Sequence, residues 1–284
     1  MKLLHEATAA LAAFPIEVAR LSAWLMFLFV IFVPLERLFP HRRQEIFRKG
    51  FAQDVLYYFL SNLIPKLVLV VPLSLAARAA HHFLPLAMYD TVAAMPFGLR
   101  VLAGLVVGEL GAYWAHRWSH EIPWLWRYHS VHHAAEEMDW IVHTRTHPVD
   151  IIFTRLCALI PLYLTGLAQP VSNRMDLAPV LVTIAATIWG FLIHANINWR
   201  FGWLEYVVTT PAFHHWHHTN DSSQLTNKNF SPVLPLMDKC FGTFYLPKQS
   251  WPQHYGLMSP METPPIQESE PATNADTIPV TAHL

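Results

Sequence analysis

Residues 116–133 read H-R-W-S-H-E-I-P-W-L-W-R-Y-H-S-V-H-H, and the rest of the chain is interpreted outward from this stretch. It holds five histidines in two groups, spaced H-x3-H and H-x2-H-H. Residues three and four apart lie on one face of a helix, so we expect each group to direct its imidazoles at one place. The H-x2-H-H spacing returns in P-A-F-H-H-W-H-H. The three boxes together contain His116, His120, His129, His132, His133, His214, His217 and His218.

Eight imidazoles exceed what one metal ion binds, and they suit two ions. Imidazole ligands favour iron, zinc, copper or nickel, whereas magnesium and calcium prefer oxygen. Structural zinc uses four ligands, usually with cysteine, and catalytic zinc keeps three, so neither accounts for this set. Two six-coordinate irons, each with a position open for dioxygen, would use eight or nine histidines. The boxes therefore predict a non-haem di-iron oxygenase site at the membrane surface.

The composition is that of a membrane protein. Of 284 residues, 53% are hydrophobic and 14% are charged, against about 25% charged in an average soluble domain. The formal net charge of −1 gives no reason to expect a nucleic-acid partner. Two cysteines support neither a disulfide framework nor a cysteine metal site.

Long apolar runs predict an all-α integral membrane bundle of about four to five transmembrane helices. The runs cover residues 21–39, 52–77, 97–114, 149–167 and 177–196. Pro65 and Lys66 interrupt the second run, which is expected to be one kinked span or two half-spans. Residues 78–96 are expected to form a loop with interfacial pieces. The last two runs are separated by a short Q-P-V-S-N turn and are expected to form an antiparallel hairpin.

The basic loop at residues 40–50 sets the expected sidedness. It carries Arg42, Arg43, Arg48 and Lys49, so the positive-inside rule places it in the cytoplasm. Counting crossings from there puts every histidine box in one cytoplasmic catalytic cap. We divide the chain into an N-terminal segment (1–20), a membrane-embedded domain (21–250) and a tail (251–284). The tail is rich in Pro, Glu, Thr and Ser and is expected to be disordered.

The order and spacing of H-R-W-S-H, H-S-V-H-H and H-H-W-H-H resemble the fatty acid hydroxylase/sterol desaturase superfamily of membrane proteins. The resemblance extends to E-R-L-F-P at 36–40, Asp54, Y-W-A-H-R at 113–117, R-T-H-P at 145–148 and D-K-C-F-G-T-F-Y at 238–245. It implies a di-iron centre that activates dioxygen, electrons from a separate reductase or redox carrier, and hydroxylated or desaturated lipid products. It also implies that the eight box histidines are iron ligands.

Three further histidines are candidates for the same site. His194 lies where some members of the superfamily have another ligand, although Asn198 replaces the second histidine of their H-x3-H, and we include His194 among the metal ligands. His147, in R-T-H-P, is expected to be a ligand or to bond to one. His143 lies four residues earlier, but Pro148 limits any helix that would cover both, and a surface role is favoured for His143.

Glu109 lies inside the third apolar run, where an ionisable residue is a functional candidate by default. It is seven residues before His116 and on the same helical face. We expect it to accept a hydrogen bond from a ligand imidazole; the alternative is a glutamate that reaches water through the same cavity. His215 is rotated about 100° from the neighbouring box histidines and is expected to be no ligand.

These patterns predict an oxidoreductase that hydroxylates an unactivated carbon of a lipid. Desaturation is left open, because both reactions begin with removal of a hydrogen atom. The lipid is also left open among a sterol or hopanoid, a fatty acyl lipid, an alkylglycerol and a carotenoid. A histidine-rich membrane metal-binding or transport protein is the alternative from another class. A transporter needs ligands along a path near the bilayer midplane, whereas these lie at helix ends.

Overall fold

The structure of the chain is a computed structural model that describes residues 2–168, 177–248 and 250–257, with side chains from residue 14 onward except at 177–180. Every regular element within these ranges is a helix, which confirms the predicted all-α class. The β pairing there is limited to two isolated antiparallel bridges, Pro40 with Ile197 and Thr219 with Tyr255.

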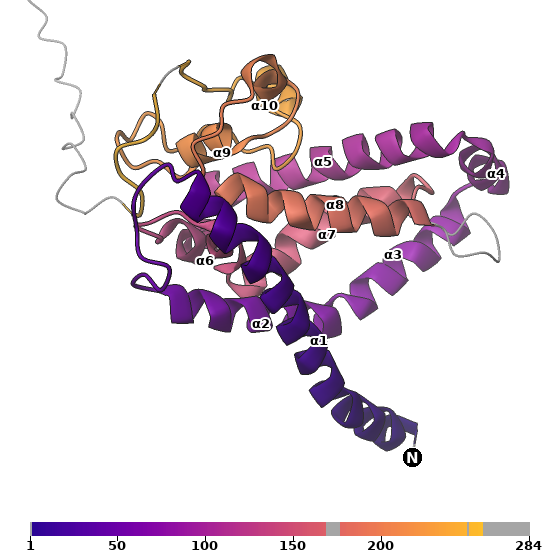
Figure 1. Cartoon of the computed structure of the whole chain (residues 1–284). Helices are drawn as coiled ribbons and strands as arrows, with labels where there is room; N and C mark the ends of the chain where they lie inside the picture. The colour runs from indigo at the N-terminus through magenta and orange to yellow at the C-terminus, as the bar shows by residue number, and fades with distance from the viewer. Residues whose placement is uncertain (1, 169–176, 249, 258–284) are drawn as a thin grey trace, which may run out of the picture.

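The first helix, α1 (Lys2–Leu38), lies diagonally across the rest of the bundle (Figure 1). Its Leu21, Leu28 and Phe32 enter the main apolar core, which also contains Tyr58 of α2 (Phe51–Val68) and Trp140. Phe32 stacks on the Trp140 indole at a ring-centroid distance of 5.9 Å. Large side chains therefore hold α1 against the structure that carries the histidine boxes.

The second apolar run is broken, as predicted. The helices α2 and α3 (Val70–Phe83) meet at Leu69 with a bend of 44°. Pro72 explains the position of the bend, because its ring clashes with the carbonyl four residues earlier, that of Val68, where α2 ends. The break therefore lies beyond Pro65 and Lys66, which are both inside α2.

The expected loop at residues 78–96 is wrong. The helix α3 continues to Phe83, and a further helix, α4 (Leu86–Ala94), covers most of the remaining residues of this range. The A-A-R-A-A sequence at 76–80 consists of strong helix formers and outweighs the absence of a clear apolar period. Extended backbone at Pro85 and Pro96 marks the starts of α4 and of the next helix.

The long helix α5 (Phe97–Glu121) is central to the bundle and packs against α6 (Pro123–His133), α7 (Pro148–Leu164) and α8 (Leu177–His194). It packs tightly on α7 at Gly111, where an added Cβ would lie 2.1 Å from the carbonyl oxygen of Cys157. The helices α7 and α8 run in opposite directions (Figure 1), but each packs on α5 more than on the other, unlike the expected hairpin. The turn predicted between them lies outside the described residues.

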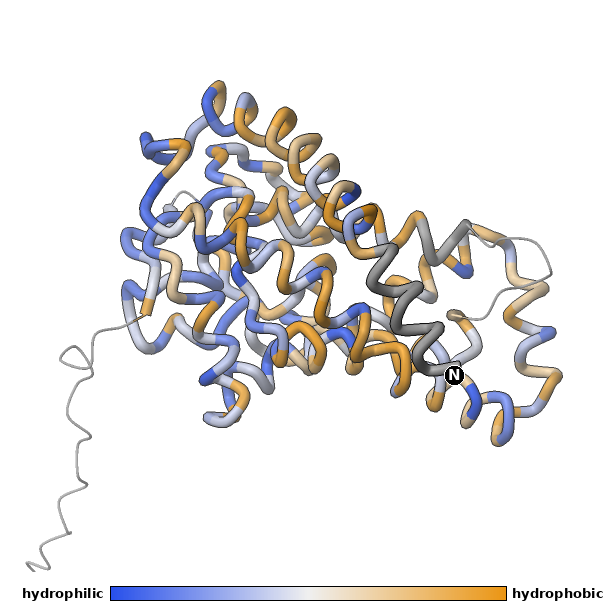
Figure 2. The backbone as a smooth tube through the Cα atoms, turned by 90° about the horizontal axis from the view of Figure 1, so that it is seen from below, coloured by the Kyte–Doolittle hydropathy of each residue, from blue (hydrophilic) through white to orange (hydrophobic). Residues whose placement is uncertain are grey.

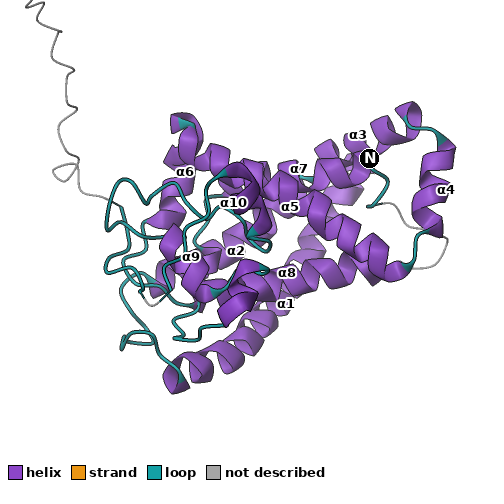
Figure 3. Cartoon of the chain, turned by 90° about the horizontal axis from the view of Figure 1, so that it is seen from above, coloured by secondary structure: helices purple, strands orange, loops and turns teal. Residues whose placement is uncertain are grey.

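Short helices and loops collect at one end of the bundle (Figure 3). They include the 3₁₀ helices η1 (Trp140–Thr144) and η2 (Gly202–Tyr206), α9 (Pro211–His217) and α10 (Leu236–Phe241). Hydrophilic residues are more frequent at this end, whereas apolar residues lie along the long helices (Figure 2). The histidine boxes lie at this end.

Two helical segments are long and apolar enough to cross a membrane, Phe14–Leu38 and Phe97–Glu121, and α2 with α3 adds a third if the bent pair is one span. Their outward faces expose large apolar side chains such as Met26, Val71 and Leu102. Such surfaces suit a lipid environment, and the chain is a membrane protein. The predicted count of four to five spans stays a prediction.

The first residues of the predicted tail, 251–257, are described by the structure. Residues 251–257 pack on the helical end, where Tyr255 is buried and pairs with Thr219. The Arg42 guanidinium lies over the Tyr255 ring at 4.7 Å and ties the basic loop to this segment. The remainder of the predicted tail lies outside the described residues.

Candidate metal centre

Prolines position the helices that carry or adjoin the boxes. The helices α6, α7 and α9 each begin with proline, at Pro123, Pro148 and Pro211, where the fixed φ suits a first helical turn and no amide hydrogen is needed. The residue before a proline avoids helical backbone, which separates α5 from α6 at Ile122. The H-R-W-S-H box therefore ends one helix, and H-S-V-H-H ends the next.

Nine histidines gather into two clusters, and in each cluster the candidate ligand atoms lie within 4.8 Å of one another. The first cluster consists of His116, His120, His129, His133 and His217. The second cluster consists of His132, His194, His214 and His218. All nine histidines selected from the sequence as ligands thus lie in positions from which they could hold a metal ion.

The expectation that each H-x2-H-H box points at one place is wrong. His129 and His133 face the first cluster, whereas His132 of the same box faces the second. The third box is divided in the opposite sense, with His217 in the first cluster and His214 and His218 in the second. Residues four apart differ by only about 40° around a helix, while the residue one position earlier is rotated by about 100°, so each box reaches two sites.

The two clusters adjoin through ring contacts. His133 of the first cluster stacks on His218 of the second with 4.4 Å between ring centroids. His217 and His218 follow each other in the chain, and their ring centroids lie 5.2 Å apart. Two ions held in these clusters would therefore share one compact centre.

Backbone carbonyls and one carboxylate fix which ring nitrogen faces the clusters. The Nδ1 atoms of His116 and His217 lie 2.7 and 2.8 Å from the carbonyl oxygens of Phe230 and Lys228. The His129 Nδ1 lies 2.9 Å from an Asp150 carboxylate oxygen. An acceptor at Nδ1 requires the proton there and leaves the Nε2 lone pair for a metal.

The strongest sign of a cation is the contact between His132 and His194. Their Nδ1 atoms donate to the carbonyls of Arg145 and Gly190, at 3.2 and 2.7 Å. Both Nε2 atoms then carry lone pairs, yet these atoms face each other at 3.2 Å. Two lone pairs at this distance repel unless a cation lies between the rings, and burial with neighbouring imidazoles holds the pKa of His132 well below its ordinary value, which disfavours a proton.

Distances in the second cluster suit octahedral angles. The Nε2 atoms of His214 and His194 are 3.0 Å apart, and those of His218 and His214 are 3.1 Å apart. Metal–imidazole bonds of about 2.1 Å at a right angle separate two nitrogens by about 3.0 Å, against about 3.4 Å at a tetrahedral angle. In the first cluster, the buried Nε2 atoms of His120, His129, His133 and His217 have no hydrogen-bond partner among the described residues. The donor set therefore fits two cations that accept imidazole.

Residues 228–231 support the first cluster from beyond α9. Asp238 of α10 accepts hydrogen bonds from the Phe230 and Ser231 amides at 2.7 and 2.9 Å, and from the Thr243 hydroxyl at 2.6 Å. It thereby holds the Phe230 carbonyl toward His116. The D-K-C-F-G-T motif noticed in the sequence contains this aspartate, but the sequence did not reveal which backbone it binds.

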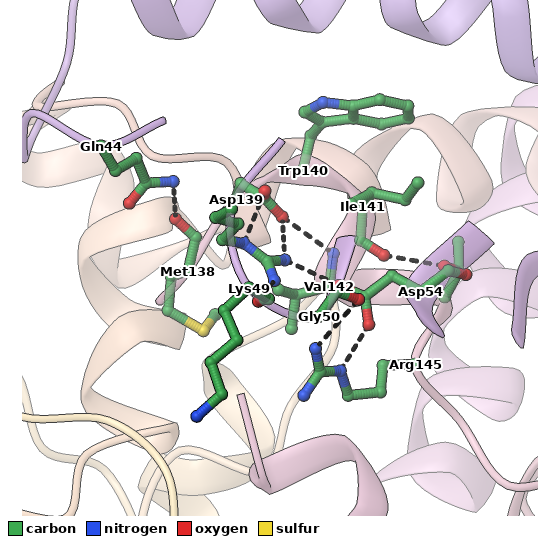
Figure 4. Close-up of polar contacts among 12 residues, drawn as sticks. Gln44, Lys49, Gly50, Asp54, Met138, Asp139, Trp140, Ile141, Val142 and Arg145 are labelled. Carbon is green, nitrogen blue, oxygen red and sulfur yellow. Dashed lines mark hydrogen bonds and ion pairs between the residues drawn. The ribbon is translucent and has the colours of Figure 1, made fainter. Parts of the chain in front are cut away.

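A buried network of four charges supports the second cluster, and Figure 4 labels three of its members, Asp54, Asp139 and Arg145. Arg48 bonds to Asp54 at 2.7 Å and to both carboxylate oxygens of Asp139, at 2.6 and 2.8 Å. Arg145 also bonds to Asp54. Because the Arg145 carbonyl accepts from His132, this charge network, defined as Arg48, Asp54, Asp139 and Arg145, holds one wall of the second cluster.

Glu109 binds backbone in place of a box histidine. Its Oε1 accepts hydrogen bonds from the Val233 and Leu234 amides, at 2.8 and 2.6 Å, and it is 4% exposed. The prediction that Glu109 bonds to a ligand imidazole is therefore wrong. The side chain instead anchors the loop that carries Phe230.

His147 lies outside both clusters. It is the N-cap of α7, where its Nδ1 accepts from the Val149 amide at 3.2 Å, and its ring packs on Tyr128. His215 also lies outside them, as predicted, and its Nδ1 is 2.9 Å from the Tyr255 hydroxyl. His143, expected at the surface, is instead half-buried, 5.2 Å from His194 between ring centroids.

Sequence reasoning missed Asp150 and the charge network as partners of the ligands. Asp150 was available as an acid in the first turn of a helix that begins after the R-T-H motif. Its contact with His129 could not be read from the chain, since 21 residues separate them. The carbonyls of Lys228 and Phe230 left no sequence signal, because any residue supplies a carbonyl.

A family model for fatty acid hydroxylases matches residues 101–243, which include every cluster histidine. The chain belongs to the fatty acid hydroxylase family. Ornithine lipid hydroxylase OlsE of Rhizobium tropici is 35% identical over 153 residues, covering 54% of this chain and 44% of that protein. Human alkylglycerol monooxygenase is 28% identical over 156 residues, covering 55% of this chain and 32% of that protein.

A third relative in the family is the very-long-chain aldehyde decarbonylase GL1-5 of Oryza sativa subsp. indica, 30% identical over 141 residues. The match covers 46% of this chain and 21% of that protein. The chain thus spans less than half the length of each of these curated relatives. No solved structure matches it significantly.

Proposed function

We propose that this protein is a membrane-bound di-iron oxygenase that hydroxylates an unactivated carbon of a lipid, using dioxygen and electrons from a separate protein. The observation that carries the proposal is the pair of opposed Nε2 lone pairs of His132 and His194, 3.2 Å apart, beside a second group of buried imidazole nitrogens that lack a hydrogen-bond partner among the described residues. Named relatives that are lipid hydroxylases support the choice of reaction.

Iron is the metal that we propose. Imidazole nitrogen suits iron among other transition metals, and the near-octahedral nitrogen spacing favours iron over tetrahedral zinc. Iron bound in the two clusters would supply the activation of dioxygen. We propose His116, His120, His129, His133 and His217 for one ion, and His132, His194, His214 and His218 for the other.

The protein's own groups orient these ligands and exclude water. The carbonyls of Lys228, Phe230 and Arg145 and the Asp150 carboxylate keep the Nδ1 protons in place, so the Nε2 atoms stay directed inward. All four histidines of the second cluster are at most 7% exposed. A buried centre protects a reactive species from solvent, which an oxygenase requires and a metal transporter does not.

Hydroxylation is favoured over desaturation by the names of two relatives, the hydroxylase OlsE and alkylglycerol monooxygenase. The aldehyde decarbonylase among the relatives means that the family name alone does not fix the reaction. The proposed substrate is a glycerolipid or other fatty acyl lipid of the host membrane.

The test is iron content together with lipid analysis. Purified in detergent, the protein should carry close to two irons per chain, and cells that express it should contain a lipid that has gained one oxygen atom. His132→Ala and His217→Ala should each abolish the product and lower the metal content, whereas the exposed His82→Ala should change neither. Full product formation by either cluster variant would refute the site, and a loss of two hydrogen atoms would identify a desaturase. Two bound irons with no altered lipid would favour the metal-binding alternative.

Cytoplasmic placement of the clusters is part of the proposal and needs its own measurement. In a Cys157→Ala, Cys240→Ala background, Ser223→Cys should react with an impermeant thiol reagent only after the membrane is opened. Labelling in intact cells would show that the histidine end faces outward.

A further inference from the structure

Arg155 is a half-buried arginine without a partner in the described part of the chain. It lies on α7 two turns after Pro148, about 10 Å along the helix from the end that carries the clusters. Among the described residues it makes no hydrogen bond, ion pair or ring contact, and no carboxylate there offsets its burial. By contrast, the buried Arg48 and Arg145 are both paired with Asp54.

The carboxylates on neighbouring elements are already bonded elsewhere. On α5, which packs along α7, Glu109 binds backbone amides and Glu121 binds Arg117. Asp54 of α2 belongs to the charge network, and Asp150 of α7 itself binds His129. The Arg155 guanidinium therefore has no counter-ion within the described ranges, and a half-buried charge of this kind favours a ligand that supplies one.

His143 is near enough to Arg155 for the two side chains to interact electrostatically, and its ring also lacks a hydrogen-bond partner among the residues that the structure describes. Gly190 makes room for this ring, because an added Cβ would lie 2.4 Å from its Cε1 atom. The ring packs on Phe191, and its centroid lies 5.2 Å from that of His194 of the second cluster.

We propose that Arg155 and His143 bind the oxyanion of a lipid headgroup, a carboxylate or phosphate, and so orient the substrate of the proposed hydroxylase. Helical side chains lean toward the helix N-terminus, which directs the guanidinium toward the histidine end. A planar guanidinium binds such oxyanions with two parallel hydrogen bonds, and an imidazole N–H adds one donor. The ligand would supply the missing counter-ion.

The location of the pair has a consequence for the position of hydroxylation. His143 interacts electrostatically with Arg155, and its ring centroid lies 5.2 Å from that of His194, a proposed metal ligand. A lipid whose oxyanion is held there presents carbons near its headgroup to the clusters, and its chain end lies farther away. The predicted position of hydroxylation rests on the proposed function, whereas the binding of the oxyanion by Arg155 and His143 does not.

The experiment measures the affinities of oleate and oleyl alcohol, whose hydrocarbon chains have the same length, for the whole protein in detergent. The dissociation constant of oleate should be about 10-fold or more higher for Arg155→Gln than for the wild type, as expected for loss of a charge-assisted hydrogen bond. Oleyl alcohol should bind both proteins equally. Arg155→Lys should retain part of the oleate affinity, and Arg78→Gln, an exposed arginine on α3, should retain all of it.

Equal oleate affinity in the wild type and in Arg155→Gln would overturn the inference. So would displacement of oleate by inorganic phosphate at concentrations near the oleate dissociation constant, because the site would then take a free anion. Iron content separates this inference from the proposed function, since Arg155→Gln should keep both irons. If the protein lacks oxygenase activity but shows Arg155-dependent oleate binding, only the proposed function fails.

Discussion

Asp54→Asn removes the carboxylate that joins Arg48 to Arg145 in the charge network. Asp54 is 0% exposed, and it is the one carboxylate that pairs with Arg145 in the described part of the chain, whereas Arg48 keeps Asp139. Loss of one partner from a buried ion pair costs about 3–5 kcal/mol. The amide oxygen can still accept one hydrogen bond, so we expect the lower end, about 3 kcal/mol. At about 2–4 °C per kcal/mol for a domain of this size, the apparent Tm should fall by roughly 6–12 °C.

The variant should also lose metal selectively. The Arg145 carbonyl accepts from His132 of the second cluster, and loss of a partner behind a ligand typically weakens metal binding about 10–100-fold. The bound iron should therefore fall from near two toward one per chain, measured by elemental analysis beside the melting curve followed by tryptophan fluorescence.

Glu205→Gln is the matched control. It disrupts another ion pair, between the half-buried Arg200 and the buried Glu205 at 2.8 Å, whose hydrogen bonds go to residues outside both clusters. It should lower the Tm but keep both irons. An Asp54→Asn protein with unchanged Tm and two irons would refute the reasoning, and equal metal loss in both variants would refute the route through Arg145.

The geometry supports three further predictions. With the metal chelated, the apparent Tm should fall as the pH drops through about 6.5. The buried cluster histidines have pKa values far below those of the same residues in the unfolded chain, so the unfolded chain binds more protons below that pH. A Tm that stays constant between about pH 7.5 and 5.5 would contradict this. Gly111→Ala should destabilise the protein by about 1–3 kcal/mol, because its Cβ would strike the Cys157 carbonyl, whereas Gly104→Ala, with open space around it, should be neutral or stabilising in the same melting assay. Glu109→Leu strands two backbone amides at about 1–3 kcal/mol each, so it should lower the Tm and the iron content, with Glu109→Gln intermediate; wild-type values for Glu109→Leu would remove the residue from the support of the site.

The sequence was most informative where the chemistry requires a particular side chain. Imidazole at H-x3-H and H-x2-H-H spacing identified eight of the nine cluster histidines, and the resemblance to the family added His194, because few other roles need so many neutral nitrogens together. The all-α class and the broken second run followed from long apolar stretches and proline.

The sequence was least informative where backbone groups or distant contacts decide the geometry. The angular spacing within each box allows it to reach two sites, but which histidine faces which cluster depends on how α6 and α9 are oriented against each other, which their own residues do not specify. Glu109 is unusual in an apolar run, but its partners are amides 124 and 125 residues away. The hydrogen bond between Arg145 and His132 likewise passes through a carbonyl that any residue would provide.

The division of the boxes links the loading of the two sites. The helix α6 ends in candidate ligands of both clusters, and α9 does the same, so an ion bound in the first cluster would restrict the backbone that carries His132, His214 and His218. A second ion would then bind with less loss of conformational entropy, which is positive cooperativity. A titration of the metal-free protein should pass from empty to doubly loaded chains with few singly loaded ones, and native mass spectrometry would count each species.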